Sequence, residues 1–179
     1  MIFTPAKIHG AYIIAPEKRG DERGWLTRTW CQKEFAEHGI NTNLVQGYIS
    51  FTKEKGTIRG LHYQITPYAE NKLSRCLTGS IYEVIIDLRL DSPTYTQWQG
   101  FTFKACQNKL LFTPANCAHA FLTLEDNTQF MSFYSQPYNS EYEQGIRYND
   151  PFFAINWPIK VEHISDKDQS WEDFRLPNK

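Results

Sequence analysis

Between residues 45 and 134 the chain consists of short runs typical of β-strands, separated by turn sequences at regular spacing. Residues 81–89 (IYEVIIDLR) alternate apolar and polar side chains at both ends, which is the pattern of a strand with one face toward a core. The turn TGS at residues 78–80 predicts a hairpin that joins this strand to another at residues 72–77. Further strands are predicted at residues 97–104, 109–113, 118–124 and 129–134. Such a series indicates an all-β jelly-roll barrel or sandwich.

Helical signals are few and short. Residues 31–38 (CQKEFAEH) look helical and precede Gly39, a residue type that commonly follows a helix C-terminus. Ser165 is a candidate N-cap for a second short helix. The 179 residues, 41% of them hydrophobic, suffice for one sizeable core, and no linker or repeat divides them. We therefore expect a single domain over residues 1–179, all-β with a few short helices.

Charge and cysteine usage argue against several classes of function. The formal net charge of -1 provides no bulk attraction for nucleic acid. No apolar run reaches the roughly 20 residues of a transmembrane helix, and the opening MIFTP is no signal peptide, so we expect no membrane partner and a cytoplasmic location. The cysteines form no C-x-x-C pair, which argues against zinc and favours buried free thiols in a reducing compartment. They are Cys31, Cys76, Cys106 and Cys117.

Two segments each place one histidine in a short β-type run beside a turn: RGLHYQ at residues 59–64 and PANCAHAF at residues 114–121. Alternate side chains of a strand share a face, so His62 lies on the same face as Gly60 and Gln64. An imidazole on the inner face of a β-barrel can take a proton from a bound substrate near neutral pH. Together with Arg59 and Lys72, the pattern indicates a pocket for an anionic substrate and a base that acts on it.

Seven motifs follow one another along the chain: GDERG (20–24), IRGLHYQ (58–64), KLSRC (72–76), DSPT (91–94), PANCAHAF (114–121), GIRYND (145–150) and NWP (156–158). In this order they resemble the dTDP-4-dehydrorhamnose 3,5-epimerase family, in register from about residue 10 to residue 170. The resemblance implies a cupin-type jelly roll, a homodimer with exchanged N-terminal strands, and no metal or organic cofactor. The implied substrate is a nucleotide-diphosphate 4-keto-6-deoxyhexose.

The resemblance also implies a mechanism through an enolate. The C4 carbonyl of such a sugar acidifies the protons on C3 and C5, so a base removes one, and reprotonation from the opposite face inverts the carbon. His62 matches the family's base, and Asp168 matches the aspartate that orients it. A carboxylate on one ring nitrogen fixes the tautomer and raises the basicity of the other nitrogen. Lys72 matches the lysine that stabilises the enolate.

Further positions match residues that bind the substrate. Arg59 and Arg23 match cations at the diphosphate or sugar, with Arg23 reaching in from the partner chain. An arginine suits this task because its planar fork binds phosphate oxygens in pairs. His119 matches a second histidine that hydrogen-bonds the substrate. Gln46 matches a glutamine at the nucleotide, and Tyr138 matches a ring that stacks on its base.

The tyrosine that serves the family as proton donor is missing from this chain. Aligned without a gap it falls on Ser132, whose hydroxyl is a far weaker acid and too short to reach the same point. Either another group supplies the proton or one of the two inversions is lost. Tyr134 shares the face of Ser132 but stands two residues further along. Tyr48 stands where the family usually has an asparagine, and we predict that its phenol is the replacement donor, with a packing role as the alternative.

A second departure from the family lies at Arg28. It stands where the family commonly has a glutamate that helps to bind the nucleotide, so we place Arg28 among the substrate-binding residues with its charge reversed. This reversal weakens the prediction that thymidine is the base. CDP- and GDP-linked sugars are therefore open alternatives.

Two other classes of protein compete with an epimerase. A metal-dependent cupin needs two histidines one residue apart, and the second position here is Gln64, a poor ligand. His62, His119 and Glu83 can still gather on one face as a metal triad. A sugar-nucleotide binding module without catalysis is favoured only by the missing donor tyrosine, because the matched base, lysine and aspartate all remain.

We therefore predict an epimerase that inverts C3 and/or C5 of a nucleotide-diphospho-4-keto-6-deoxyhexose. Its product is expected to feed deoxysugar synthesis for a surface polysaccharide or a glycosylated metabolite. A single-centre C3 or C5 epimerase is the main alternative, because the proton donor has changed.

Overall fold

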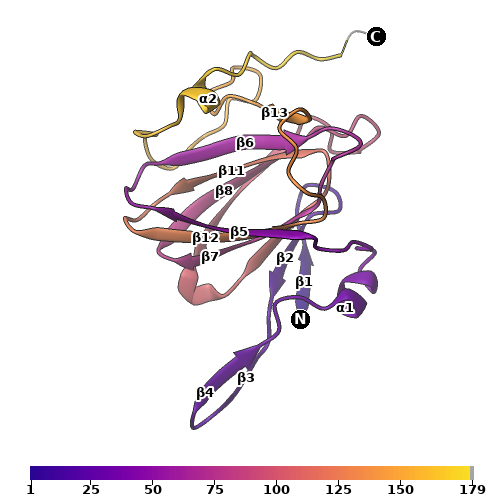
Figure 1. The fold of residues 1–179 in the computed structure, drawn as a ribbon, viewed down its shortest axis with the longest axis vertical. Coiled ribbons are helices and arrows are strands. Elements are labelled where there is room, and N and C mark those ends of the chain that lie inside the picture. Colours follow the sequence, from indigo (N-terminus) through magenta and orange to yellow (C-terminus); the bar gives the residue numbers. More distant parts are fainter. Residues whose placement is uncertain (178–179) are drawn as a thin grey trace.

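Two antiparallel β-sheets face each other in the computed structural model, which describes residues 1–177 (Figure 1). One sheet has six strands, in the order β1 (Ile2–Pro5), β2 (Tyr12–Ala15), β10 (Leu110–Thr113), β7 (Lys72–Thr78), β12 (Thr128–Tyr134) and β5 (Gln46–Thr52). The other has five, in the order β13 (Glu143–Gly145), β6 (Ile58–Gln64), β11 (Cys117–Thr123), β8 (Ser80–Asp87) and β9 (Trp98–Lys104). The predicted all-β jelly-roll class is confirmed.

The other elements are short. A separate hairpin of β3 (Lys18–Asp21) and β4 (Gly24–Thr27) stands away from both sheets (Figure 1). The helices are α1 (Gln32–Ala36), the 3-10 turn η1 (Ala105–Gln107) and α2 (Asp166–Gln169). Within residues 1–177, no helix has both the length and the apolar character needed to cross a membrane.

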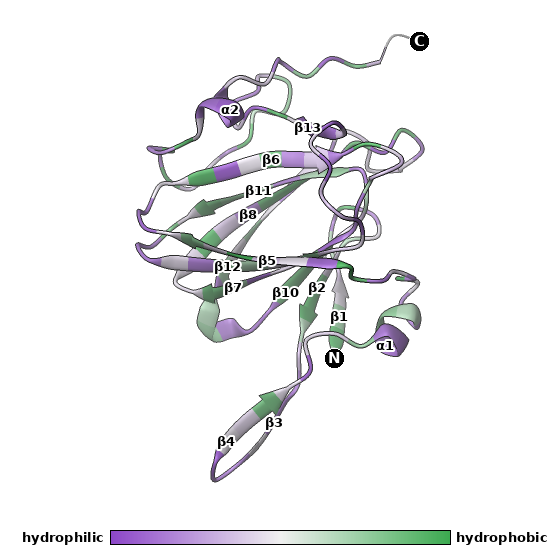
Figure 2. Cartoon of the chain, in the orientation of Figure 1, coloured by the Kyte–Doolittle hydropathy of each residue, from purple (hydrophilic) through white to green (hydrophobic). Residues whose placement is uncertain are grey.

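The burial of both faces of strand β8 explains why apolar and polar residues alternate only at the ends of its sequence. Ile81 and Ile85 are buried in the core between the two sheets. Val84 and Ile86 are buried on the other face, under the C-terminal segment that covers the five-stranded sheet. Figure 2 shows this strand and its neighbour β11 as largely hydrophobic. Because both faces are covered, the middle of the strand carries apolar side chains on both sides.

The predicted hairpin between residues 72–77 and 81–89 is wrong. The two strands exist, but β7 pairs with β10 and β12, whereas β8 pairs with β11 and β9 in the other sheet. The turn around Gly79 therefore carries the chain from one sheet to the other. Gly79 has φ +77°, and a Cβ there would collide with Thr128. A turn sequence marks the end of a strand, but it does not say whether the next strand pairs with the first.

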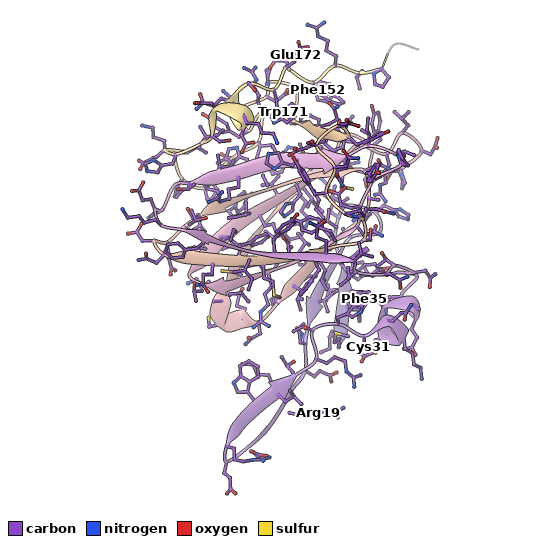
Figure 3. The ribbon with its side chains drawn as sticks, viewed as in Figure 1. Arg19, Cys31, Phe35, Phe152, Trp171 and Glu172 are labelled. Atoms are coloured by element: carbon purple, nitrogen blue, oxygen red, sulfur yellow. The ribbon has the colours of Figure 1, made fainter. Side chains whose placement is uncertain are left out.

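The helix predictions hold, with shorter elements. Helix α1 ends at Ala36, and Gly39 adopts φ +77° just beyond it. Phe35 anchors this helix, since its ring is buried against the six-stranded sheet (Figure 3). Ser165 caps α2 as predicted, because its Oγ accepts a hydrogen bond from the backbone N–H of Asp168 at 3.1 Å.

All four cysteines are free. Cys76 and Cys117 are buried as expected, and burial raises their pKa to about 11 and about 12. Cys31 is half-buried. The expectation of a buried thiol is wrong for Cys106, which is exposed in the 3-10 turn that links the sheets.

Candidate functional site

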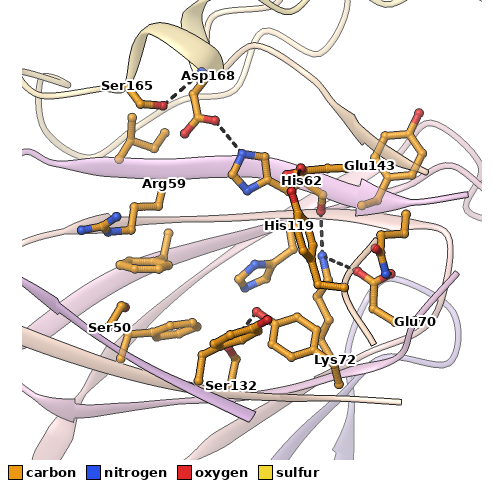
Figure 4. A pocket seen from close by; sticks show the side chains of 18 of the residues that line it. Ser50, Arg59, His62, Glu70, Lys72, His119, Ser132, Glu143, Ser165 and Asp168 are labelled. Atoms are coloured by element: carbon orange, nitrogen blue, oxygen red, sulfur yellow. Dashed lines mark hydrogen bonds and ion pairs between the residues drawn. The ribbon is translucent and has the colours of Figure 1, made fainter. Parts of the chain in front are cut away.

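A cavity of about 630 Å³ opens between the inner faces of the two sheets (Figure 4). Its walls come from β5, β7 and β12 on one side, and from β6, β11, β13 and helix α2 on the other. Eight of the ten predicted site residues line it: Gln46, Tyr48, Arg59, His62, Lys72, His119, Tyr138 and Asp168. The fold thus gathers into one cavity residues that are spread over more than 100 positions of the chain.

His62 and Asp168 form a part-buried pair in one wall, with the His62 side chain 34% exposed toward the cavity. The ring Nε2–H of His62, on β6, donates to Asp168 Oδ1 at 2.6 Å (Figure 4). Asp168 is only 4% exposed. Burial alone would raise its pKa, but the hydrogen bond from His62 and the contribution of Gly60 outweigh burial and hold the pKa below its usual range. With Nε2 bound to a carboxylate, Nδ1 is the nitrogen that can accept a proton from a substrate.

Gly60 is needed to build this pair. It has φ +109°, and a Cβ there would meet the carbonyl of His119 and the side chain of Ala120. The pairing of β6 with β11 shifts register at this point. The Gly60 N–H is thereby directed to Asp168, and donates to Oδ2 at 3.1 Å. Both oxygens of Asp168 are thus held, which fixes the orientation of His62.

Lys72 lies across the cavity on β7. Its Nζ donates to the backbone carbonyl of His62 at 2.7 Å and lies 3.2 Å from Glu70 Oε1 (Figure 4). Lys72 is 4% exposed, and burial lowers its pKa from the ordinary value despite the opposing effect of Glu70. The ammonium is thus held by two oxygens at a fixed place beside the base.

A second histidine–carboxylate pair lies deeper. His119 pairs with His62 across the β6–β11 ladder, and its Nε2–H donates to Glu83 Oε1 at 2.6 Å. Glu83 is fully buried and also accepts a hydrogen bond from Ser74 Oγ. Burial lowers the pKa of His119, which keeps its ring neutral. His119 therefore presents a neutral ring as a hydrogen-bonding group to the cavity.

The wall opposite His62 carries hydroxyl groups. Ser132 lies on β12 and pairs directly with Tyr48 on β5. Tyr134, two residues along β12, pairs with Gln46 on one side and Lys72 on the other. Ser132 is buried, Tyr134 is half-buried, and Tyr48 is 47% exposed. A phenol in this wall therefore faces the cavity from the side opposite to His62.

Gln46 and Tyr138, which are predicted to bind the nucleotide, lie at the mouth of the cavity, in one network of hydrogen bonds. Gln46 Oε1 accepts a hydrogen bond from the backbone N–H of Tyr138 at 2.7 Å. The Tyr138 hydroxyl donates to Glu143 Oε2 at 2.5 Å, and Lys167 Nζ donates to the same oxygen at 2.5 Å. Burial acts to raise the pKa of Glu143, but these two hydrogen bonds outweigh it and lower the pKa. This network ties the loop of Tyr138 to helix α2.

Sequence reasoning missed three charged residues that line the cavity, which are Glu70, Glu143 and Lys167. Their signal was weak, because the sequence marked two of them only by their closeness to matched residues and did not mark the third. Glu70 precedes Lys72 by two residues, and Lys167 is adjacent to Asp168. Glu143 is not close to a matched residue, and reaches the site because β13 pairs with β6.

The predicted arginines divide into two groups. Arg59 lines the cavity, where its Nε–H donates to Thr52 Oγ1 at 3.1 Å. Arg23 is 85% exposed at the tip of the β3–β4 hairpin and pairs with Asp21. Arg28 follows the hairpin and pairs with Glu34 Oε1 at 2.7 Å. Neither Arg23 nor Arg28 contributes to the cavity of its own chain.

The proposed metal triad does not assemble. Across residues 1–177, no group of three or more His, Cys, Asp or Glu side chains is arranged to hold a metal ion. His62 and His119 are neighbours, but each directs its Nε2 to a different carboxylate.

Known proteins are similar to this chain in sequence and in fold along nearly its whole length. The sequence model of the dTDP-4-dehydrorhamnose 3,5-epimerase family matches residues 5–175. The chain belongs to this family. The family's enzyme from Shigella flexneri is 37% identical over 169 residues, which cover 94% of this chain and 93% of that protein. The enzyme from Sinorhizobium fredii (strain NBRC 101917 / NGR234) is 36% identical over 171 residues, covering 95% and 88%. The chain is therefore a sugar-nucleotide epimerase.

Solved epimerase structures match the fold closely. The enzyme from Bacillus anthracis, with TDP and PPi bound, superposes with a TM-score of 0.92 at 36% identity, covering 97% of this chain and 99% of that one. The 3,5-epimerase from Legionella pneumophila, in complex with dTDP-4-keto-L-rhamnose, gives 0.88 at 34% identity, covering 96% and 92%. A relative from Streptomyces niveus, named dTDP-4-dehydrorhamnose 3-epimerase, is 31% identical over 170 residues, covering 94% and 82%. Epimerases of one and of two centres are thus both similar to this chain.

Proposed function

We propose that this epimerase acts on a dTDP-linked 4-keto-6-deoxyhexose and inverts it at C3 and C5 by way of an enolate. One observation carries the proposal: the His62–Asp168 pair lies in one wall of the cavity, and phenols lie in the opposite wall. Inversion requires a base on one face of the sugar and an acid on the other. The relatives that bind TDP or dTDP-4-keto-L-rhamnose support the choice of substrate.

His62 is the base in this proposal. Its Nδ1 takes a proton from C3 or C5 while Nε2–H stays bound to Asp168, which stabilises the imidazolium that forms. The C–H electron pair moves into the ring and gives an enolate with its charge on the C4 oxygen. Tyr48 then returns a proton to the carbon from the opposite wall, as predicted from the sequence.

Lys72 stabilises the enolate oxygen. It is a buried ammonium that is already fixed by Glu70 and the His62 carbonyl, so little reorganisation is needed when charge develops on the substrate. The neutral ring of His119 adds a hydrogen bond to the sugar from the same wall as His62.

Binding of the nucleotide involves groups at the mouth. Tyr138 stacks on the base and Gln46 holds its loop, a role supported by the hydrogen bond between them. Arg59 binds the diphosphate from within the chain. Arg23 and Arg28 reach the diphosphate and nucleotide of a second chain, in a homodimer that exchanges N-terminal strands.

The shape of the chain supports this dimer. The β3–β4 hairpin projects away from the sheets and exposes Trp25 and Leu26, at 54% and 75% (Figure 1). Strand β5, at the edge of the six-stranded sheet, exposes Ile49 and Phe51 on its outer face, at 66% and 54%. Exposed apolar side chains on an unpaired edge strand favour a partner of the same kind.

Epimerisation at a single centre is the second candidate. Ser132 favours it, because the family's donor position holds no phenol. The relative named as a 3-epimerase shows that single-centre enzymes occur within this similarity range. We place the reaction in deoxysugar synthesis, and the free thiols favour the cytoplasm as its location.

Proton NMR in heavy water tests the proposal. The purified enzyme is mixed in turn with 4-keto-6-deoxyglucose linked to dTDP, CDP or GDP. We expect inversion with deuterium entering C3 and C5, fastest for the dTDP sugar. Inversion at one carbon would establish the second candidate, and preference for CDP or GDP would correct the nucleotide. Tight binding without any exchange would identify a binding module.

A further inference from the structure

The wall opposite His62 holds two phenols, although the resemblance leads one to expect a single donor. Tyr48 is the neighbour of Ser132 on the adjacent strand, and Tyr134 is its neighbour along the same strand. Their rings meet edge to face, with centroids 5.6 Å apart and an interplanar angle of 71°. The missing tyrosine position is therefore flanked by two phenols that touch each other and line the same cavity.

Tyr134 reaches further than its place in the sequence indicates. Ser132 Oγ–H donates to the Tyr134 hydroxyl at 2.8 Å, so the phenol oxygen lies beside the serine and not two residues away from it. The Tyr134 ring therefore extends along β12 toward position 132, where the family has its tyrosine. A serine leaves room for this arrangement, which a tyrosine at the same position would fill.

Each phenol oxygen accepts a hydrogen bond from a different neighbour. Ser132 donates to Tyr134, and Gln46 Nε2 donates to Tyr48. An incoming hydrogen bond leaves the phenol's own proton free for transfer, and it stabilises the phenolate that remains. Tyr134 is also half-buried, and burial raises its pKa, so the phenol keeps its proton over the neutral range. Both residues thus have the surroundings of a general acid.

We propose that Tyr134 is a second proton donor beside Tyr48, and that each phenol reprotonates a different one of the two carbons that flank C4. This inference rests on the proposed function. C3 and C5 lie on either side of the carbonyl carbon, so one fixed donor requires the sugar to shift between the two inversions. Two adjacent donors in one wall serve both carbons with the sugar held in one place.

The proton balance of each step closes within the site. His62 removes the proton from one face of the carbon, and the C–H electron pair forms the enolate. The enolate then forms a new C–H bond with the phenol proton on the opposite face, as the O–H bond breaks and its electron pair stays on the phenolate. The C4 carbonyl forms again. His62 loses its proton to solvent, and the phenolate takes one up before the next step.

Tyr48→Phe and Tyr134→Phe test the division of labour, with Tyr82→Phe on the outer face of β8 as the matched control. Proton NMR in heavy water follows deuterium entry and inversion separately at C3 and at C5. We expect each site variant to lose inversion about 10²-fold or more at one carbon, a different carbon for each variant. Deuterium still enters that carbon, because His62 removes a proton and returns a deuteron to the same face. Unchanged binding of dTDP checks the fold of each variant.

Three outcomes would overturn the proposal. Full inversion at both carbons by Tyr134→Phe would remove the second donor. Loss of inversion at both carbons in one variant and at neither in the other would establish a single donor. Inversion at only one carbon by the unmodified enzyme would leave no task for a second phenol. By contrast, an unmodified enzyme that exchanges no proton with any of the three sugars would contradict the proposed function itself.

Ser132 is a positioning residue in this scheme, and a pH profile tests it. Removing its hydroxyl in Ser132→Ala takes away a hydrogen bond that stabilises the phenolate, so the pKa of Tyr134 rises further. The donor must be protonated, so the alkaline fall in rate at its carbon moves to higher pH. Ser132→Thr keeps the hydroxyl and should retain the original profile. Identical alkaline limbs in all three proteins would show that Ser132 does not act on Tyr134.

Discussion

The cavity and the β3–β4 hairpin hold their charged side chains in different ways. In the cavity, His62 is bound by Asp168, which lies 106 residues away, in a part-buried hydrogen bond of 2.6 Å. On the hairpin, Arg23 pairs with Asp21, only two residues away, and its side chain is 85% exposed. The cavity groups have fixed orientations before any ligand binds. The hairpin arginine has only a local, solvent-screened partner, of a kind that contributes little to stability.

This difference separates two kinds of residue, those that act on protons and those that bind the substrate. The groups that we propose move protons are fixed by the fold of one chain, which agrees with the preorganised geometry that catalysis requires. Arg23, which we propose binds phosphate in the site of a second chain, lies on a hairpin that projects from the sheets. Substitutions in the cavity should therefore change the rate of the chemical steps, and substitutions on the hairpin should change binding of the substrate.

His62→Ala should have the largest effect of any single substitution. Without the base, we expect turnover to fall toward the upper end of about 10²–10⁴-fold, with deuterium exchange lost at both carbons. Binding of dTDP should remain, because the His62 side chain is 34% exposed and Asp168 keeps its hydrogen bond from the backbone N–H of Gly60. Steady-state kinetics and proton NMR in heavy water provide the two measurements. Near-normal turnover in this variant would remove the proposed mechanism entirely.

Lys72→Met should have the next largest effect, because it removes the cation that we propose stabilises the enolate oxygen while preserving the length of the side chain. A loss of about 10²–10³-fold in kcat is expected. The substitution also leaves the buried Glu70 carboxylate without its cation, with only the hydrogen bond from Gln64 remaining, which destabilises the fold. The double variant Lys72→Met/Glu70→Gln separates the two effects. It should recover thermal stability and stay slow; recovery of kcat along with stability would assign Lys72 a structural role only.

Arg23→Ala should act mainly on binding. A charge-assisted hydrogen bond to phosphate contributes about 1.5–3 kcal/mol, so we expect kcat/KM to fall about 10–100-fold, mostly through KM. If Arg23 serves the partner's site in an exchanged dimer, as we propose, the defect should be complemented between chains. Dimers of one Arg23→Ala chain and one His62→Ala chain, isolated with two affinity tags, should hold one complete site and show about half of the wild-type activity.

The matched control places both substitutions on one chain. A dimer of an unmodified chain with an Arg23→Ala/His62→Ala chain then lacks any complete site, because the only intact His62 faces a partner without Arg23. Its activity should resemble that of Arg23→Ala alone at half the number of sites. Half of the full wild-type activity in this control dimer would mean that Arg23 serves its own chain.

The same division explains what could be predicted from the sequence. Strand positions, the cap at Ser165 and the shared face of His62 and Gln64 follow from local periodicity and turn chemistry, and they were right. The connection at Gly79 was wrong, because strand pairing depends on the whole topology. A local sequence signal states where an element ends, and tertiary contacts decide what it pairs with.

The site shows the same limit in its side chains. Its matched residues were found because each stands at a position that matches the family, and Glu143 was missed because only the pairing of β13 with β6 brings it to the cavity. The position of the Tyr134 hydroxyl could not be predicted either, because it depends on a side-chain rotamer that directs the ring along the strand toward Ser132. Spacing gives the face of a strand, and packing decides how far a side chain extends over that face.

The smallest expected effect concerns proton uptake on folding. Burial holds the pKa of His119 below its ordinary value, so in acid the unfolded chain binds a proton that the folded chain does not. Stability should therefore fall as the pH drops from about 6.5 toward the lowered pKa, with a slope of at most about 1.4 kcal/mol per pH unit from this one group.

Urea unfolding at a series of pH values measures the slope of stability against pH. His119→Gln should flatten it, whereas His9→Gln, at an exposed position outside the cavity, should not. Asp168 affects stability over a different range of pH. Because its pKa in the folded chain is lowered, its contribution to the free energy of unfolding is lost only below pH values near 4, the ordinary pKa of an aspartate. An equal slope in the wild type and His119→Gln would mean that the buried ring takes up its proton as readily in the folded chain, and that the cavity does not differ from the surface in this respect.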